Sequence, residues 1–140
     1  MKLLLENWRG YISEVKVSSR SEVIDLINNN PDRNINIDCP KGKCKKFGGE
    51  PRPLPFDYGE WTDIINPADD MGWDLIIVPS AGEEREKLVP VGYVSYAEGS
   101  GKEGNDKIII APDGKYNDKD LNTIESFFSP LENFNDVKWL

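Results

Sequence analysis

Apolar residues recur at helical spacing in three stretches of the chain. These are residues 4–15 (LLENWRGYISEV), 22–30 (EVIDLINNN) and 118–134 (DKDLNTIESFFSPLENF). Apolar residues three or four positions apart form one face of an amphipathic helix. The second stretch ends before Pro31 and the third contains Pro130, and proline ends or bends a helix. We therefore predict two N-terminal helices and a closing C-terminal helix.

Between the predicted helices, short apolar runs alternate with Gly, Pro and Asn. The runs are residues 35–38 (INID), 73–79 (WDLIIVP), 88–96 (LVPVGYVSY) and 106–112 (DKIIIAP). Short runs rich in Val, Ile and Tyr and bounded by turn residues are typical of β-strands. Helices, then strands, then a helix predict an α+β fold with a small, mostly antiparallel, OB-like β-barrel at its centre. We divide the chain into an N-terminal helical segment, 1–30, and a barrel domain, 31–140.

Length and charge limit the class of protein and its partners. With 140 residues the chain is long enough for one domain with a substantial core. Its formal net charge of −8 argues against nucleic acid or an anionic membrane as partner, because both require a basic surface. No apolar run reaches the ~18 residues of a membrane span, and Glu6 and Arg9 interrupt the segment where a signal peptide is apolar. We expect a cytoplasmic protein.

The chain contains no histidine, and its two cysteines are Cys39 and Cys44. A zinc site needs more Cys or His ligands than this pair supplies, so reduced thiols of a cytosolic protein are the better interpretation. Without histidine, Ser-His-Asp and Cys-His catalysis are excluded. Any acid–base chemistry must use carboxylates, lysines, tyrosines or metal-bound water.

Three acids lie at the start of one apolar run. Residues 66–78 (NPADDMGWDLIIV) contain Asp69, Asp70 and Asp74. Acids are common in turns, so a solvated loop before a strand is one interpretation. Hard cations bind carboxylate oxygens, so a metal site, formed where a Gly-containing turn brings Asp69 and Asp74 together, is the other.

Six segments of the chain follow one another in an order that a known family shares. They are INIDCPKG leading to KKF, LPFDYGEW, DDMGWDLII, LVPVGYVSYAEGSGKEGNDKIIIAP, KYNDKDLN and SFFSPLENFNDVKWL. Over residues 35–139 this order resembles the soluble, magnesium-dependent inorganic pyrophosphatases of family I. The resemblance implies a barrel of that type and hydrolysis of inorganic pyrophosphate to phosphate, with Mg²⁺ or Mn²⁺ as cofactor. Pyrophosphate or another phosphoanhydride is then the expected ligand. Whether the chain forms a homo-oligomer is left open.

The resemblance also implies which acids carry the chemistry. Asp69 and Asp74 fall on metal ligands, with Glu98 or another acid of its loop as the third. Asp70 and Asp74 are the predicted catalytic carboxylates. A magnesium ion held by carboxylates neutralises phosphate oxygens and supplies hydroxide near neutral pH. For Glu98, which lies in the Gly-rich loop EGSGKEGND, a solvated acid is the alternative.

Three further residues fall on the phosphate-binding positions of the family: Lys46, Tyr58 and Lys107. Cationic and hydroxyl groups at these positions would hold the phosphate oxygens of the substrate. Each has a plainer alternative. Lys46 belongs to a run of lysines, which is typical of a solvated face, and Tyr58 could be a core residue.

Several residues depart from the pattern of the family. In the family, an aspartate holds the nucleophilic water. This chain has Met71 at that position, and a methionine side chain is a poor magnesium ligand and cannot act as a base. At two other positions where the family has an acidic residue, this chain has Gly48 and Asn105. The alternative function is therefore a catalytically inactive, pyrophosphatase-like binding or structural module. If the loss of activity is due to Met71 alone, Met71→Asp is expected to restore a third carboxylate and to raise the rate of pyrophosphate hydrolysis.

The N-terminus suggests one further hypothesis. MKLLLENWRGYISE resembles leader peptides on internal head proteins of large tailed phages, which a protease cuts after a Leu/Ile-x-Glu motif. Here that motif is Ile12-Ser13-Glu14. If residues 1–14 are such a leader, the protein is expected inside the virion. The alternative is an amphipathic helix packed on the domain, and either is compatible with both functions.

Overall fold

The computed structural model describes residues 15–30, 33–47, 50–67, 70–96, 106–131 and 134–140. The predicted leader, 1–14, lies outside these residues, as does the predicted first helix apart from Val15. Asp69 and Glu98 lie outside them as well. Among the helices that are described, none combines the length and the apolar character needed to cross a membrane.

The described elements are two α-helices, one 3₁₀ turn and nine strands. In chain order they are β1 (Val15–Lys16), α2 (Arg20–Asn29), β2 (Ile35–Cys39), β3 (Cys44–Phe47), β4 (Glu50–Pro53), β5 (Asp57–Asn66), β6 (Met71–Ile77), η1 (Pro79–Ala81), β7 (Leu88–Tyr96), β8 (Lys107–Pro112), α3 (Asp118–Phe128) and β9 (Phe134–Trp139).

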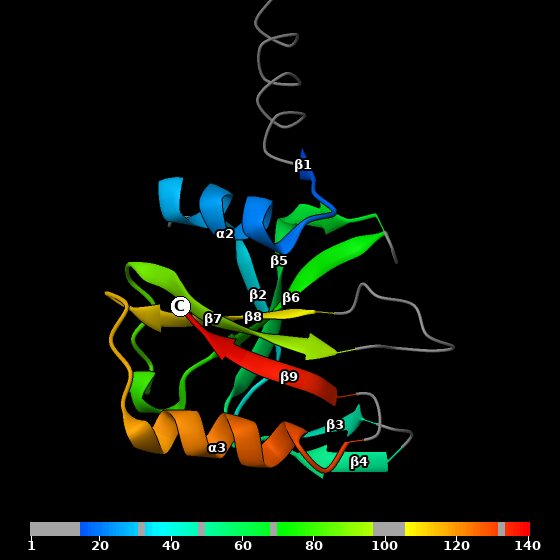
Figure 1. Ribbon diagram of the computed structural model, residues 1–140, viewed down its shortest axis with the longest axis vertical. Helices are drawn as coiled ribbons and strands as arrows, with labels where there is room; N and C mark the ends of the chain where they lie inside the picture. The colour runs from blue at the N-terminus through cyan, green and yellow to red at the C-terminus, as the bar shows by residue number, and fades with distance from the viewer. Residues whose placement is uncertain (1–14, 31–32, 48–49, 68–69, 97–105, 132–133) are drawn as a thin grey trace, which may run out of the picture.

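Seven strands form one mixed sheet (Figure 1). Their order is β1-β5-β6-β8-β7-β9, and β2 pairs with β5 beside this path. The β1–β5 and β6–β8 pairs are parallel, and the other pairs are antiparallel. The hairpin of β3 and β4 forms a separate two-stranded sheet. The predicted α+β class is therefore confirmed.

The predicted closure into a barrel is wrong, because the sheet of the described strands is open. Its ends are β1 and β9, which do not pair with each other. The physical reason lies in the central strands, which are buried on both faces: Leu75, Ile76 and Ile77 are each at most 1% exposed. Such strands need a cover on each side. Here α2 and α3 supply the covers on opposite faces of the sheet, so the sheet buries its apolar residues without closing (Figure 1).

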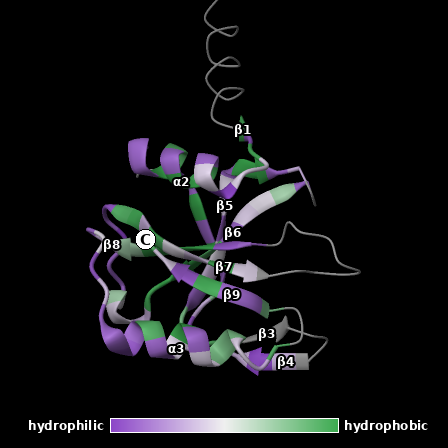
Figure 2. Cartoon of the chain, in the orientation of Figure 1, coloured by the Kyte–Doolittle hydropathy of each residue, from purple (hydrophilic) through white to green (hydrophobic). Residues whose placement is uncertain are grey.

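Each helix forms a core with one face of the sheet. Val23 of α2 packs in one core with Leu75, and Ile124 of α3 packs in the other with Ile76. Successive side chains of a strand point to opposite faces, which is why neighbours in β6 enter different cores. Figure 2 shows both helices as alternating hydrophilic and hydrophobic residues, as expected when one side of each helix faces a core.

Most predicted elements are confirmed, with differences at the C-terminus. The helix predicted at 22–30 is α2, and the four predicted strands are β2, β6, β7 and β8 with small shifts of their ends. The C-terminal helix is shorter than predicted, since α3 ends at Phe128 and the chain from Phe134 forms β9. Strands β1, β3, β4, β5 and β9 are not predicted from the sequence, and Val15, expected at the end of the first helix, lies in β1.

Candidate functional site

Three predicted site residues lie together in the large sheet. Lys107 Nζ lies 3.1 Å from Asp74 Oδ2 and 5.4 Å from the centre of the Tyr58 ring. The three residues come from β8, β6 and β5, and they meet because β6 pairs with both of the other strands. We call this group the Asp74–Lys107–Tyr58 cluster.

The cluster is built around a buried cation. The Lys107 side chain is 1% exposed and Tyr58 is 2% exposed, whereas the Asp74 side chain is 24% exposed. A charge removed from water must be compensated by an opposite charge or by hydrogen bonds. Asp74 supplies the opposite charge, and the Tyr58 ring adds a cation–π contact. This burial leaves almost no surface of Lys107 for a phosphate group to contact.

Asp70 lies apart from the cluster. Its side chain is 80% exposed, and it forms an ion pair with Lys16 at 3.5 Å. Because β6 is extended from Met71 onwards, the backbones of Asp70 and Asp74 are ~13 Å apart at ~3.3 Å per residue. Carboxylates that share a magnesium ion lie about 2.1 Å from it. The predicted turn at Gly72 is therefore wrong, because Gly72 lies within a strand. Asp69, which this turn is expected to bring to Asp74, lies outside the described residues.

The described residues do not fit a magnesium ion. Within them, no group of three or more His, Cys, Asp and Glu residues is placed to hold a metal. Asp74 Oδ2 already faces the ammonium group of Lys107, which repels a divalent cation from that oxygen. Asp69 and Glu98, the other predicted ligands, lie outside the described residues.

Lys46, the third predicted phosphate contact, lies in a different sheet from the other two. It belongs to β3 and is opposite Pro51 of β4, whereas Tyr58 and Lys107 belong to the large sheet. The backbones of the three predicted phosphate contacts thus belong to two sheets.

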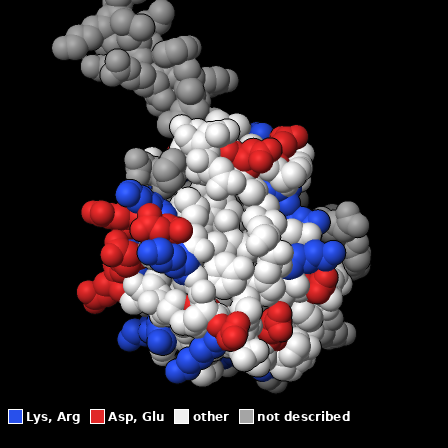
Figure 3. All heavy atoms as spheres, turned by 60° about the vertical axis from the view of Figure 1, so that its left-hand side comes forward, with Lys and Arg blue, Asp and Glu red and all other residues white. Residues whose placement is uncertain are grey.

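Charged side chains of both signs share the surface. On the face shown in Figure 3, Asp and Glu side chains lie next to Lys and Arg around an uncharged central area. Neighbouring opposite charges partly cancel each other at a distance. On this face, recognition of an anion would depend on individual basic side chains.

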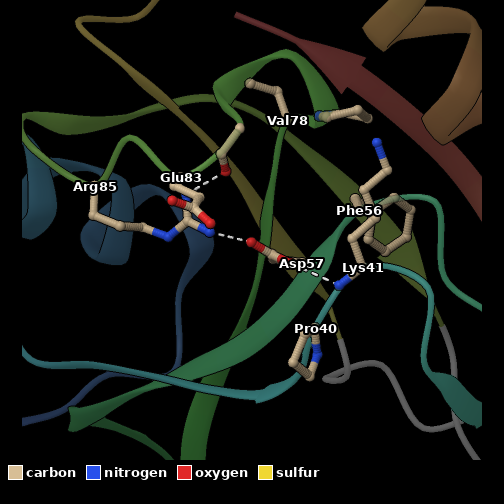
Figure 4. A pocket seen from close by; sticks show the side chains of 9 residues that line it. Pro40, Lys41, Phe56, Asp57, Val78, Glu83 and Arg85 are labelled. Atoms are coloured by element: carbon tan, nitrogen blue, oxygen red, sulfur yellow. Dashed lines mark hydrogen bonds and ion pairs between the residues drawn. The ribbon is translucent and has the colours of Figure 1, made fainter.

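A hollow of about 370 Å³ opens where β6 ends and β5 begins (Figure 4). It is lined by residues from the loop after β2, from the start of β5 and from the chain around η1. These residues are Pro40, Lys41, Phe56, Asp57, Val78, Pro79, Gly82, Glu83 and Arg85. The sequence does not single out this set, because its members are far apart along the chain and carry no common spacing. The only local signal is the Pro-Lys-Gly turn after β2.

Asp57 is the centre of the polar contacts in the hollow. The backbone N–H of Lys41 donates to Asp57 Oδ1 at 2.7 Å, and the guanidinium group of Arg85 forms an ion pair with Asp57 Oδ2. Figure 4 shows Arg85 and Lys41 on opposite sides of this carboxylate. Arg85 also donates to the carbonyl oxygens of Gly82 and Glu84, at 2.9 and 2.8 Å. The charge of Asp57 is thus compensated, and Arg85 is held in place.

Two charged side chains of the hollow remain open to solvent. Within the described residues, neither the ammonium group of Lys41 nor the carboxylate of Glu83 has a hydrogen-bond or ion-pair partner. The hollow can therefore offer a cation to an anionic ligand, with Glu83 opposing the binding by repulsion.

The wall of the hollow at η1 is fixed to α3 by one buried carboxylate. The backbone N–H of Ser80 donates to Asp120 Oδ1 at 2.9 Å, and the Ser80 hydroxyl donates to Asp120 Oδ2. Asp120 also accepts from the Asn117 N–H at 3.1 Å, and its own N–H donates to the Asn117 side chain at 2.9 Å. This is a capping box at the start of the helix. These hydrogen bonds hold η1 against the start of α3.

The structure thus brings together Tyr58, Asp74 and Lys107. It pairs the exposed Asp70 with Lys16 and places the backbone of Lys46 in the β3–β4 hairpin. It also shows a hollow beside Asp57 that the sequence does not predict. No family model matches the chain, and no curated protein or solved structure matches it at a significant level.

Proposed function

We propose that the chain is a pyrophosphatase-like binding module that does not hydrolyse pyrophosphate. The ion pair between Lys107 and Asp74 carries this proposal. A phosphate-binding lysine must contact the substrate, but Lys107 is 1% exposed. A carboxylate that holds a metal must be free of competing cations, but Asp74 faces an ammonium group at 3.1 Å. Both residues are thus engaged in stabilising the sheet.

The proposed relationship to the OB-like barrel of family I rests on the order of the segments along the chain. We regard the open sheet as a relative of that barrel in which the two edges do not meet. Strand β5 pairs with β6 and also with β1 and β2, and the register shifts within both the β2–β5 and the β5–β6 pair. Such irregular pairing bends a sheet in the way that barrels require.

The ligand of the module is a phosphoanhydride such as pyrophosphate, bound in the hollow. Lys41 offers an unpaired ammonium group there, and the compensated carboxylate of Asp57 does not repel an anion strongly. Lys41 also belongs to the segment INIDCPKG, one of those on which the resemblance rests. A phosphate oxygen beside Lys41 would form a charge-assisted hydrogen bond.

Titration calorimetry with pyrophosphate, in the absence of metal, tests the binding. We expect saturable binding that Lys41→Ala weakens about tenfold, the usual effect of one charge-assisted contact. Glu83→Ala removes a repulsive charge and is expected to strengthen the binding. Lys115→Ala, in the turn after β8, is the control for a change of net charge. Binding that is absent, or equally weakened by Lys41→Ala and Lys115→Ala, would remove the ligand from the hollow.

The second candidate function is Mg²⁺-dependent pyrophosphate hydrolysis. One observation favours it: Tyr58, Asp74 and Lys107, which the resemblance assigns to one active site, do lie together. Catalysis at this cluster would require the Asp74–Lys107 pair to open, and Asp69 and Glu98 would have to complete the metal site. In either case we propose a cytoplasmic protein, or an intravirion one if residues 1–14 are a cleaved leader.

A further inference from the structure

Strand β9 forms one edge of the large sheet and has an unoccupied side. It pairs with β7, and no other described strand pairs with it. The N–H of Leu140, the residue after β9, donates to the carbonyl of Val91 at 2.9 Å. Because backbone groups alternate along a strand, Lys138 and Asp136 direct their N–H and C=O groups to β7 in the same way. The backbone groups of Val137 and Trp139 therefore point outward, away from the sheet.

We propose that β9 pairs with β9 of a second copy of the chain, antiparallel and about a two-fold axis at Val137. In this arrangement the two Val137 residues face each other and exchange both of their backbone hydrogen bonds. The regular pairing of β9 with β7 runs from Trp139 to Asp136, and the register shifts before Phe134. The proposed contact is therefore centred on residues 136–138, and the same patch of both subunits forms it, as an isologous interface requires.

Charge complementarity selects this register. A two-fold axis at Val137 places Asp136 directly opposite Lys138 of the partner subunit, and the reverse pair forms on the other side of the axis. Both side chains are exposed, and within the described residues neither has an ion-pair partner. They lie on the face opposite to Val137 and Trp139, which pack against the core of α3. Opposite charges in directly facing positions stabilise strand pairing, and like charges oppose it.

Leu140 is 63% exposed, which makes it one of the large hydrophobic side chains that remain in solvent. It lies at the end of the proposed strand pair, beyond Trp139. Phe134 is not its partner, because Phe134 packs against the core of α3 together with Val137 and Trp139. The interface is narrow, one strand from each subunit, so we expect dissociation in the micromolar to millimolar range rather than a permanent dimer.

Sedimentation velocity of the full chain over this concentration range tests the dimer. We expect the mass to rise from 15.8 kDa towards twice that value as the concentration increases. Val137→Pro should keep the chain monomeric, because it removes an N–H with which no described strand pairs, and an edge strand tolerates proline there. A mass that stays at 15.8 kDa up to millimolar concentration would overturn the proposal.

Charge variants test the register independently of proline. Asp136→Lys and Lys138→Asp each place like charges opposite each other twice, so each should weaken the dimer tenfold or more. When the two variants are mixed, every facing pair is again opposite in charge, and a heterodimer should form. Lys115→Asp is the control and should dimerise as the wild type does. Dimerisation that neither single variant weakens, or that mixing does not restore, would contradict pairing at Val137.

Discussion

Lys107 is buried in the large sheet beside Asp74 and Tyr58. The resemblance groups it with Tyr58 and Asp74, and the three do meet in the folded chain. What the sequence cannot supply is the depth of the site. Burial of a lysine depends on which strands pair around it, and these strands come from distant parts of the chain. Its side chain is 1% exposed and its ammonium group lies 3.1 Å from Asp74, and the structural role that we propose for Lys107 rests on this contact.

Removal of Asp74 tests the structural role of this pair. Asp74→Ala leaves the ammonium group of Lys107 buried without its carboxylate, so we expect a loss of about 2–3 kcal/mol in the free energy of unfolding. Lys107→Met should cost less, because the 24% exposed Asp74 side chain can still be solvated. Urea denaturation of both variants measures the difference. An Asp74→Ala variant as stable as the wild type would show that the pair does not stabilise the fold.

For Met71, the structure leads to a different expectation from the sequence. It lies three residues before Asp74 on an extended strand, so the two side chains point to opposite faces. Met71→Asp therefore should not add a carboxylate to the cluster, and Mg²⁺-dependent phosphate release should stay unchanged. Because Met71 is 59% exposed, stability should change by less than about 0.5 kcal/mol. A tenfold gain in hydrolysis would show that the two carboxylates do share a metal.

At the scale of elements, helices and strands with a clear pattern of apolar residues are predicted from the sequence, and those without such a pattern are not. Strands β6 and β8 are short apolar runs, and α2 has helical spacing, so their local pattern is sufficient. Strand β5 contains Gly59 and the buried polar residues Asp63 and Asn66, which break the pattern of a strand. Asp63 is tolerated there because Arg33 pairs with it at 3.2 Å, a contact that no local pattern reveals.

The pairing of β5 with β6 depends on the absence of a side chain at Gly72. A Cβ atom at this position would lie 2.1 Å from the carbonyl oxygen of Trp61, so the two strands would have to separate. We expect Gly72→Ala to cost about 3 kcal/mol in the free energy of unfolding, the upper range for overpacking. Gly42→Ala is the control: its φ of +88° carries backbone strain, but the added Cβ meets no atom within 4 Å. That variant should lose only about 1 kcal/mol, and equal losses would exclude a steric role for Gly72.

At the scale of the whole molecule, the sequence predicts the class of the fold but not its closure. Apolar runs between helices are compatible with a barrel and with an open sheet. The choice depends on whether helices cover both faces, as α2 and α3 do (Figure 1). The hollow beside Asp57 could not be predicted for a similar reason. It is formed by three segments that become neighbours only after the sheet has assembled.

Shortened chains test where the folded domain begins. Val15 and Lys16 pair with Ile64 and Ile65, and the indole N–H of Trp73 donates to the Val17 carbonyl at 2.7 Å. If residues 1–14 are a leader, a chain that begins at Val15 should have a free energy of unfolding within about 0.5 kcal/mol of that of the full chain. A chain that begins at Ser18 loses these contacts and should be less stable by about 2–4 kcal/mol. A comparable loss already on removal of residues 1–14 would indicate a helix packed on the domain.

The central claim is that Asp74 and Lys107 stabilise the sheet and do not perform catalysis. Phosphate release from pyrophosphate, measured with saturating Mg²⁺ and again with Mn²⁺, tests it most directly when the wild type is compared with Asp74→Asn. We predict that the folded wild type releases phosphate no faster than the solution without protein, and that Asp74→Asn behaves identically. Metal-dependent release by the wild type that Asp74→Asn abolishes, in a variant that is still folded, would contradict the claim and make the cluster an active site.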